Sequence, residues 1–178
     1  RAFPPAPQQQ QQQQQQHAMA SLPNPPSLVE YKDKRFLIFD APNDDNLPMY
    51  MREFSKHKVA HVVRVCDPTY SASRLRDVGI DVTDLSFSDG ASPPKHVVET
   101  WLSTVKAVSK ASPSACIGIH CVAGLGRAPV LVAIALIEEG LAPAEAVDFI
   151  RRSRRGAINT NQLRWLRSYH KRGGCAVM

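Results

Sequence analysis

The sequence predicts an α/β fold in which a central, mostly parallel sheet is flanked by helices. Short runs of apolar and β-branched residues, typical of buried strands, recur along the chain. Longer stretches with helical periodicity separate these runs, as they do in units that join parallel strands. The chain has 178 residues, of which 43% are hydrophobic and 21% charged, and this is the composition of one ordinary globular domain.

Four segments are expected to form buried strands. Each is short, rich in apolar or β-branched residues, and bounded by polar residues, glycine or proline. The expected strands are residues 36–39, 59–65, 80–85 and 115–120. Because open sheets of this kind bind ligands at the carboxyl ends of their strands, the residues after 120 are the first candidates for a functional site.

Helices are expected between and after these strands. They include residues 47–58 and a weaker segment that contains Leu75 and Val78. A longer amphipathic helix follows Pro93 and Pro94, since proline is favoured in a first helical turn. The last three expected helices are 129–138, which Gly140 ends, 144–152, and a helix that Asn159 caps and that runs through 169.

The chain is expected to divide into three parts. Residues 1–26 hold a glutamine run between proline clusters and offer almost nothing to bury, so they predict a disordered leader. Residues 27–170 form the folded domain, and 171–178 form a short basic tail. The longest apolar stretch, around 130–137, is shorter than the roughly 20 residues of a membrane-spanning helix, and no signal peptide opens the sequence. The chain is therefore expected to be neither transmembrane nor conventionally secreted.

Positive charge is concentrated near the C-terminus. The net charge is +6, and residues 151–178 contain eight Lys and Arg residues and no acidic one. Neither aromatic interleaving, a zinc pattern nor a helix-turn-helix signature accompanies this charge, so nucleic acid is not expected as a partner. An anionic membrane surface or a phosphorylated ligand fits this charge better.

The four cysteines have spacings that match no zinc module, and a chain of this size needs no disulfide to build a core. We therefore expect a reduced, cytosolic setting, with no metal and no cofactor. Cys116 lies inside an expected strand and is interpreted as a buried structural thiol.

The loop after the last expected strand has the pattern of a phosphate-binding site. Cys121 opens it and Arg127 closes it, and the residues between them are Val122, Ala123, Gly124, Leu125 and Gly126. A glycine-containing loop at a helix start directs backbone N–H groups inward and binds anions with the help of the helix dipole. Arg127 can grip two phosphate oxygens, and the same positive field favours a nucleophilic Cys121 thiolate. The alternative, a buried cysteine followed by an exposed arginine, leaves the two glycines unexplained.

Phosphoryl transfer also needs an acid that protonates the leaving oxygen. Asp89 is the best candidate, because it follows an expected strand and Gly90 allows its loop to hinge over the site. Two alternatives remain open. Asp89 only caps the turn before Gly90, or Asp84, at the end of its strand, is the acid.

The pattern His-Cys-x-x-Gly-x-x-Arg at 120–127 resembles the signature loop of the protein tyrosine phosphatase superfamily. More narrowly, residues 120–133 resemble the phosphatase of regenerating liver family, also called protein tyrosine phosphatase type 4A. Other segments that resemble it are 63–66 with Thr69 and Tyr70, 89–91 with the prolines that follow, and 154–157 with Asn159. The resemblance covers about residues 30–178 and leaves the glutamine-rich leader outside.

This resemblance implies the cysteine-based protein tyrosine phosphatase fold for 27–170. It also implies a dual-specificity type of phosphatase that forms a phosphocysteine intermediate on Cys121, with Arg127 and Asp89 as the other catalytic residues. The sequence departs from the family in the acid loop, where 85–88 lacks a Trp-Pro start and Ser92 is inserted before the prolines.

Several residues around the loop gain an expected role from the resemblance. Ala128 stands where most cysteine phosphatases carry Ser or Thr, whose hydroxyl stabilises the departing thiolate, so slow breakdown of phosphocysteine is expected. In the family, the cysteine that matches Cys66 forms a reversible disulfide with the nucleophile, which implies a Cys66–Cys121 pair under oxidation. The alternative for Cys66 is a buried structural thiol. Val122 and Leu125 are apolar where phosphoinositide phosphatases tend to carry lysines, which disfavours inositol lipids as the main substrate.

The last four residues, 175–178, fit a prenylation box in which Cys175 is modified, and the terminal methionine favours farnesyl. One lipid chain anchors a protein only marginally. Residues 151–155, Lys171 and Arg172 are therefore expected to add attraction to anionic lipid, and the alternative for 151–155 is a solvated helix face. The expected location is the cytoplasmic face of the plasma membrane or of endosomal membranes, with an unprenylated cytosolic pool.

The sequence thus predicts a prenylated phosphatase that acts on proteins phosphorylated on Tyr, with Ser and Thr as further targets. Two alternatives remain open: a phosphorylation- and redox-sensitive docking module for a membrane partner, and a phosphoinositide phosphatase. The resemblance implies binding to cyclin-and-CBS-domain magnesium transport mediators, with Arg155 and the rim of the site as contacts. It also suggests a membrane-associated homotrimer.

Overall fold

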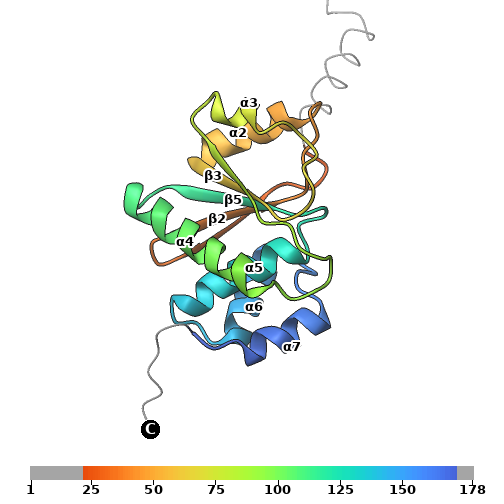
Figure 1. Ribbon diagram of the computed structural model, residues 1–178, viewed down its shortest axis with the longest axis vertical. Helices are drawn as coiled ribbons and strands as arrows, with labels where there is room; N and C mark the ends of the chain where they lie inside the picture. The colour runs from red at the N-terminus through yellow and green to blue at the C-terminus, as the bar shows by residue number, and fades with distance from the viewer. Residues whose placement is uncertain (1–21, 172–178) are drawn as a thin grey trace, which may run out of the picture.

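A five-stranded sheet runs through the middle of the molecule in the order β1-β2-β5-β3-β4 (Figure 1). The structure, a computed structural model, describes residues 22–171. The strands are β1 (Ser27–Tyr31), β2 (Lys34–Phe39), β3 (Val59–Arg64), β4 (Asp81–Asp84) and β5 (Cys116–His120). Only β1 is antiparallel to its neighbour, and the other three strand pairs are parallel. The prediction of an α/β fold with a mostly parallel sheet is confirmed.

The antiparallel edge strand β1 was not expected from the sequence. It pairs with β2 from Ser27 to Tyr31, and its side chains are mostly half-exposed, so that only Val29 is buried. A strand at the edge of a sheet needs little apolar pattern, because backbone pairing holds one side of it. Lys32 adopts a positive φ of 51° in the tight turn that leads into β2.

Helices cover both faces of the sheet (Figure 1). On one face lie α2 (Leu47–His57) and α3 (Ser73–Arg76), and on the other lie α4 (Lys95–Ala111), α5 (Arg127–Glu138), α6 (Pro143–Ser153) and α7 (Thr160–Ser168). These bounds agree with the expected helices to within a few residues. Helix α5 packs against α4, α6 and α7 and is buried along nearly its whole length. A helix that is apolar on all sides suits this central place.

Contacts of the domain begin before the expected boundary at residue 27. Leu22 packs against the core on the α2 side of the sheet, and Asn24 Nδ2 donates to Asp40 Oδ2 at 2.8 Å. Residues 1–21 of the expected leader and 172–178 of the expected tail, with Cys175, lie outside the described residues. Within 22–171, no helix is both long and apolar enough to span a bilayer.

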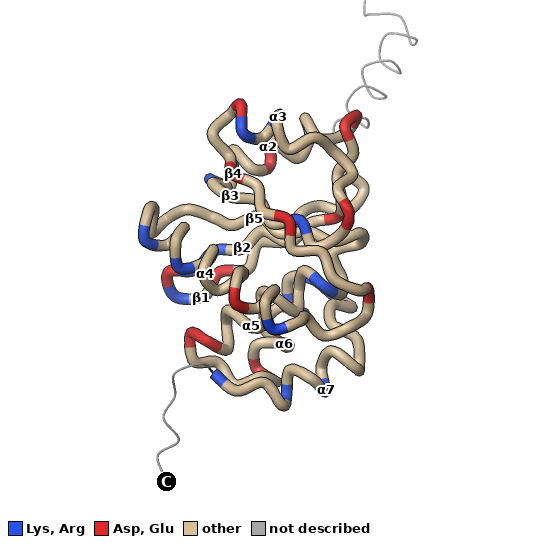
Figure 2. The backbone as a smooth tube through the Cα atoms, viewed as in Figure 1, with Lys and Arg blue, Asp and Glu red and all other residues tan. Residues whose placement is uncertain are grey.

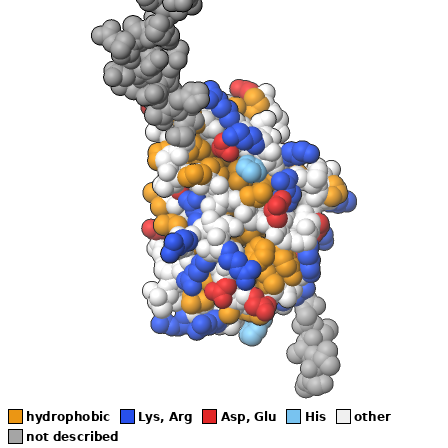
Figure 3. Space-filling view, turned by 180° about the vertical axis from the view of Figure 1, so that it is seen from behind, with side chains coloured by type: hydrophobic (Ala, Val, Ile, Leu, Met, Phe, Trp, Pro, Cys, Tyr) orange, Lys and Arg blue, Asp and Glu red, His pale blue; other side chains and the backbone are white. Residues whose placement is uncertain are grey.

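The basic segment after residue 150 offers less charge to solvent than its sequence suggests. Arg164, Arg167 and Lys171 are exposed on and just after α7, where Figure 2 shows blue positions along the helix. In contrast, Arg151 donates to the carbonyls of the chain before α7, and Arg154 is buried. The expectation that all of 151–155 faces an anionic surface is therefore wrong for Arg151 and Arg154. On the face of the molecule that is turned away from the viewer in Figure 1, Lys and Arg are interspersed with acidic and apolar side chains (Figure 3).

The carboxyl ends of β5 and β3 meet at one edge of the sheet. Arg64 is paired with His120, and the Val65 amide donates to the His120 carbonyl at 2.8 Å. The chain that follows each strand therefore leaves the sheet at the same place, and this brings Cys66 and Cys121 into one region.

Candidate active site

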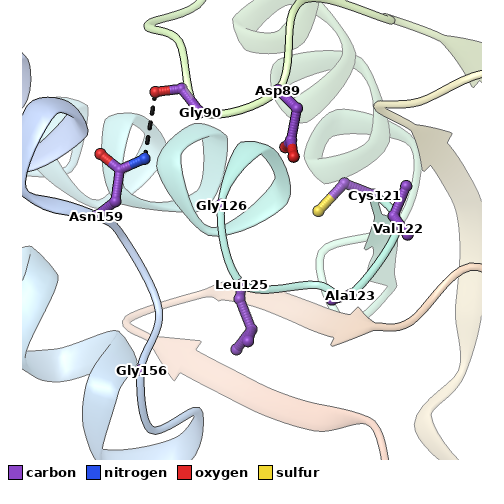
Figure 4. A pocket seen from close by; sticks show the side chains of 9 residues that line it. All are labelled: Asp89, Gly90, Cys121, Val122, Ala123, Leu125, Gly126, Gly156 and Asn159. Atoms are coloured by element: carbon purple, nitrogen blue, oxygen red, sulfur yellow. Dashed lines mark hydrogen bonds between the residues drawn. The ribbon is translucent and has the colours of Figure 1, made fainter.

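A cavity of about 300 Å³ opens at this edge of the sheet, above the loop that joins β5 to α5 (Figure 4). Cys121 lies at its base with 2% of its surface exposed. The residues that line the cavity come from this loop, from the acid loop and from the chain before α7; they are Asp89, Gly90, Cys121, Val122, Ala123, Leu125, Gly126, Gly156 and Asn159. The cavity thus brings together the expected nucleophile, the expected acid and four of the expected loop residues, whereas Gly124 and Arg127 are not among its lining residues.

The four carbonyls of residues 122–125 all accept hydrogen bonds on the outer side of the loop. The Val122 carbonyl accepts from the Ala41 amide at 2.9 Å, and the Leu125 carbonyl accepts from the Ile158 amide at 2.7 Å. Those of Ala123 and Gly124 accept from the Arg154 guanidinium at 3.0 and 2.9 Å. Because a trans peptide directs its N–H opposite to its carbonyl, the amides of residues 123–126 are turned the other way, toward the cavity. Four such amides at a helix start form an anion-binding nest.

Arg154 is the side chain that holds this loop from behind, a role that was not predicted from the sequence. Only 8% of the residue is exposed, and it also pairs with the Asp40 carboxylate. Gly124, with φ of 62°, allows the close approach: a Cβ there would lie 2.6 Å from Arg154 Nη2 and 2.7 Å from the Phe39 carbonyl. Arg154 was expected on a charged surface as part of the basic cluster 151–155, and its partner Asp40 is more than a hundred residues away in the chain.

Arg127 begins α5, and its side chain reaches the acid loop. It is 7% exposed, and its Nη1 donates to the Phe87 carbonyl at 3.2 Å. Its buried Nε makes no hydrogen bond within the described residues, although Asp89 Oδ1 lies 3.1 Å away. The two groups are an ion pair without the alignment of a hydrogen bond. A buried donor of this kind is unusual in a folded protein and indicates a ligand position.

Asp89 lies on the loop after β4, on the other side of the cavity from the nest. Its side chain is 78% exposed and points toward the cavity (Figure 4). Gly90 follows with φ of 72°, a conformation that glycine adopts without strain, and its carbonyl accepts from Asn159 Nδ2 at 3.2 Å. Asn159 therefore lines the cavity in addition to capping α7, which was its only expected role.

Asp84, the alternative acid, has a different partner. Arg64 binds its carboxylate through two nitrogens, with Nε to Oδ1 at 2.5 Å and Nη2 to Oδ2 at 2.8 Å. This guanidinium lowers the pKa of the Asp84 carboxyl below its usual value. Because Asp84 is already paired with Arg64, while Asp89 lines the cavity and lies beside Arg127, the geometry favours Asp89 as the acid.

His120 lies beneath the nucleophile and is fully buried. Its Nε2 lies 3.0 Å from the Tyr70 hydroxyl, and its Nδ1 lies 3.2 Å from the Cys121 carbonyl. Burial lowers the pKa of His120 to about 4, so the ring is neutral near pH 7. A neutral imidazole can donate from one nitrogen and accept at the other, which suits these two neighbours. The ring therefore fixes the end of β5 where Cys121 begins the loop.

The other two described cysteines are both buried. Cys66 Sγ lies 3.9 Å from His120 Nδ1, and the same nitrogen lies 3.2 Å from the Cys121 carbonyl. Burial raises the pKa of the Cys66 thiol, and the positive Arg127 partly offsets this. Cys116 lies in β5 within the core on the α2 side of the sheet. Within residues 22–171, no group of three or more His, Cys, Asp or Glu side chains is placed to hold a metal ion.

Comparison with known proteins assigns this arrangement to a family, although no protein-family model matches the chain. The chain is 55% identical over 161 residues to probable protein tyrosine phosphatase type IVA A of Dictyostelium discoideum, and the match covers 89% of this chain and 97% of the relative. It is 50% identical over 152 residues to human protein tyrosine phosphatase type IVA 3, and this match covers 85% of this chain and 88% of the relative.

Solved structures lead to the same fold. A protein tyrosine phosphatase from Leishmania major superposes with a TM-score of 0.73 at 42% identity, over 82% of this chain and 99% of that one. Human DUSP28 shares the fold at 19% identity, with a TM-score of 0.63 over 83% of this chain and 97% of that one. Identity of about half over nearly the whole length, together with a cysteine nucleophile loop of this geometry, places the chain among the cysteine-dependent protein tyrosine phosphatases, in the type IVA family.

Proposed function

We propose that the chain hydrolyses phosphomonoesters on phosphorylated proteins, with Cys121 as nucleophile, Arg127 as phosphate ligand and Asp89 as general acid. One observation carries this proposal. All four carbonyls of residues 122–125 are bonded on the outer side of the loop, so four amides face the cavity above the buried thiol. Preorganised amides of this kind stabilise the charge that develops on the phosphoryl oxygens. The Nε of Arg127 supports the same assignment, because it is buried and has no hydrogen bond within the described residues.

The proposed reaction has two steps. In the first, the Cys121 thiolate forms a bond to phosphorus while the bond to the leaving oxygen breaks, and Asp89 gives its proton to that oxygen. The phosphoryl group remains on sulfur as phosphocysteine. In the second, water attacks phosphorus, the S–P bond breaks, and Asp89 takes a proton from the water. Arg127 and the loop amides bind the non-bridging oxygens in both steps.

The test counts product released per enzyme molecule from an aryl phosphate in strong reductant. Wild type is compared with Cys121→Ser, and covalent phosphate is followed by intact mass. Many turnovers that vanish in Cys121→Ser support a phosphatase. The absence of both turnover and covalent phosphate in the wild type contradicts the assignment of Cys121.

A second candidate function is a docking module whose binding depends on the state of Cys121. The exposure of two apolar side chains favours it, since 62% of Val122 and 41% of Leu125 are open to solvent beside the cavity. Exposed apolar residues around a polar cleft are typical of a protein-binding surface. A single stoichiometric burst with stable phosphocysteine, in the assay above, would favour this function over repeated turnover.

We also propose that Cys66 protects the nucleophile from irreversible oxidation. Peroxide oxidises the Cys121 thiolate to a sulfenic acid and is reduced to water, and the Cys66 thiolate then attacks that sulfur and displaces hydroxide. The common edge of β3 and β5, and the His120 ring that neighbours both cysteines, support this pairing. Peptide mapping after mild peroxide treatment checks it. A Cys66–Cys121 link is expected, and in Cys66→Ser sulfinic acid should accumulate on Cys121 instead; a map without the link contradicts the proposal.

Membrane association is proposed from the C-terminal sequence. Farnesylation of Cys175 would supply one anchor, and the exposed Arg164, Arg167 and Lys171 would add attraction to anionic lipid on the cytoplasmic face. Cell fractionation of wild type and Cys175→Ser tests the anchor, and an unaltered distribution contradicts it. Arg164→Gln with Arg167→Gln in the prenylated protein tests the charge, with weaker binding to phosphatidylserine vesicles as the expected result.

A further inference from the structure

The loop that carries Asp89 is held by two amide side chains at the start of α7. Asn159 and Gln162 form a reciprocal cap: Asn159 Oδ1 accepts from the Gln162 amide at 2.8 Å, and Gln162 Oε1 accepts from the Asn159 amide at 3.1 Å. Both side-chain oxygens are therefore used by the helix. Both side-chain NH₂ groups remain, and each donates to the acid loop.

These two donors reach successive carbonyls of the loop. Asn159 Nδ2 donates to the Gly90 carbonyl at 3.2 Å, and Gln162 Nε2 donates to the Ala91 carbonyl at 3.3 Å (Figure 4 shows the first). Gln162 is fully buried. Its amide and the Asp89 carboxylate both lie over Gly126, since a Cβ at Gly126 would be 3.4 Å from Gln162 Nε2 and 3.8 Å from Asp89 Oδ1. The contacts therefore fix the acid loop directly beside the phosphate loop.

The start of α7 is itself tied to the phosphate loop. The Ile158 amide donates to the Leu125 carbonyl at 2.7 Å, and Arg151 holds the carbonyls of Ala157 and Ile158, both at 2.9 Å. Ile158 has φ of 67°, which is strained for a β-branched residue and needs such contacts to persist. The segment 157–162 thus links the loop that binds phosphate to the loop that carries the acid.

We propose that Asn159 and Gln162 are positioning residues that hold the acid loop over the cavity, so that Asp89 is in place before substrate binds. Close to Asp89, the other contacts of the loop are the bond from Arg127 to Phe87, the Asp89 ion pair and the turn of the loop itself. Further back, the Leu85 amide donates to the Arg64 carbonyl and the Ser86 hydroxyl donates to Asp67. This inference rests on the proposed role of Asp89 as general acid. According to this inference, residues at the start of α7 keep the acid loop closed over the cavity, although they do not touch the reacting atoms.

We call the two hydrogen bonds from Asn159 and Gln162 to the acid loop the latch. The substitution Asn159→Ser tests the latch without removing the helix cap. Serine caps a helix about as well as asparagine, but it has no NH₂ group to reach Gly90. Asn161→Ala is the matched control, because Asn161 is exposed on the same helix and accepts a hydrogen bond from Arg164 instead of contacting the acid loop. The double variant Asn159→Ser with Asp89→Asn shows whether the two residues act together.

Two readouts separate the latch from the acid. The first is kcat/KM on unactivated phenyl phosphate and on a dinitrophenyl phosphate, whose leaving group needs no proton. Asn159→Ser should lose about five- to tenfold on the first substrate, stay within twofold on the second, and add nothing in the Asp89→Asn background. The second is hydrogen exchange of the Ala91 amide, which bonds to the Ser88 carbonyl and should exchange faster in Asn159→Ser but not in Asn161→Ala.

The outcomes test the latch and the assignment of Asp89 as the acid separately. Unchanged exchange at Ala91 overturns the latch, and so does an equal fall in kcat/KM on both substrates, which would mean that the phosphate loop was damaged instead. If Asp89→Asn alone leaves the leaving-group dependence unchanged, the assignment of the acid fails. The exchange measurement then still decides whether α7 holds the loop.

Discussion

Asp89 Oδ1 lies 3.1 Å from Arg127 Nε, but the Nε–H group makes no hydrogen bond with it. The acid and the phosphate-binding arginine are therefore neighbours before any substrate is present. An arriving phosphate dianion would take the place of the carboxylate beside the guanidinium and would repel Asp89 if it were ionised. Protonation of Asp89 removes this repulsion and supplies the proton that the leaving group needs, so substrate binding and acid catalysis favour the same protonation state.

Replacing this carboxylate should separate binding from turnover. Asp89→Asn should lower kcat on unactivated phenyl phosphate by about 10²-fold or more, because no proton reaches the leaving oxygen, while an activated dinitrophenyl ester loses much less. Binding of vanadate should stay the same or tighten, since the anion no longer meets a carboxylate. A series of aryl phosphates with increasing leaving-group pKa measures the effect. Equal losses across the series would exclude Asp89 as the acid.

Arg154 should matter to the site as much as residues inside the cavity do. Arg154→Lys keeps a positive charge for Asp40 but loses the fork that holds the Ala123 and Gly124 carbonyls. We expect the melting temperature to fall by about 5–10 °C and vanadate to bind more weakly, because the loop amides lose their fixed direction. Arg155→Lys is the matched control at the exposed neighbour and should change neither quantity. A stable Arg154→Lys protein with unaltered vanadate affinity would contradict the role of Arg154.

Most of the fold could be predicted from the local sequence pattern. The features that this pattern did not predict depend on partners that are distant in the chain. The strands β2, β3 and β5 are rich in apolar and β-branched residues, and the spacing of Cys121, Gly124 and Arg127 has few structural uses besides an anion nest. Strand β1 was missed because an exposed edge strand needs almost no apolar pattern. Arg154 was missed for a different reason: a long basic side chain is buried only when tertiary structure provides a carboxylate such as that of Asp40.

The choice of the general acid also depends on a partner that the sequence does not reveal. The sequence favoured Asp89 but left Asp84, at the end of its strand, open as an alternative acid. The choice depends on Arg64, which is buried beside Asp84 and reaches it across neighbouring parallel strands. A lone sequence does not reveal which carboxylate is already paired.

The phosphate loop requires glycine at position 124 for two separate reasons. Its φ of 62° disfavours any other residue, and a Cβ would also collide with Arg154 and the Phe39 carbonyl. Gly124→Ala should therefore lower the free energy of unfolding by about 2–5 kcal/mol, the sum of backbone strain and overpacking. Gly79→Ala is the control, because Gly79 has a similar φ of 78° with nothing within 4 Å of a Cβ. Urea unfolding of both variants measures the difference, and equal losses would show that only backbone strain matters.

His120 should make stability depend on pH below neutrality. Its pKa is lowered to about 4 by burial, against about 6.5 in an unfolded chain, so the unfolded state binds the proton more readily. The contribution is fully present above pH 6.5 and is lost as the pH falls toward 4, up to about 3 kcal/mol in total. Urea unfolding between pH 7.5 and 4.5 measures the slope. His120→Asn should flatten it, leaving the smaller contribution of His61, whose pKa burial also lowers; parallel curves would contradict this origin.

Ala128 should limit how quickly the phosphocysteine is cleared. It is fully buried in the first turn of α5, one residue after Arg127, and it has no hydroxyl to offer the departing Cys121 thiolate. Ala128→Ser should raise steady-state turnover by about tenfold, because a hydrogen bond to a charged sulfur lowers the barrier of the second step. The phosphocysteine observed by intact mass should fall correspondingly. Ala133→Ser, which buries the same hydroxyl further along α5, should not raise turnover, and if Ala128→Ser also fails to raise it, the breakdown of the intermediate is not limited by this position.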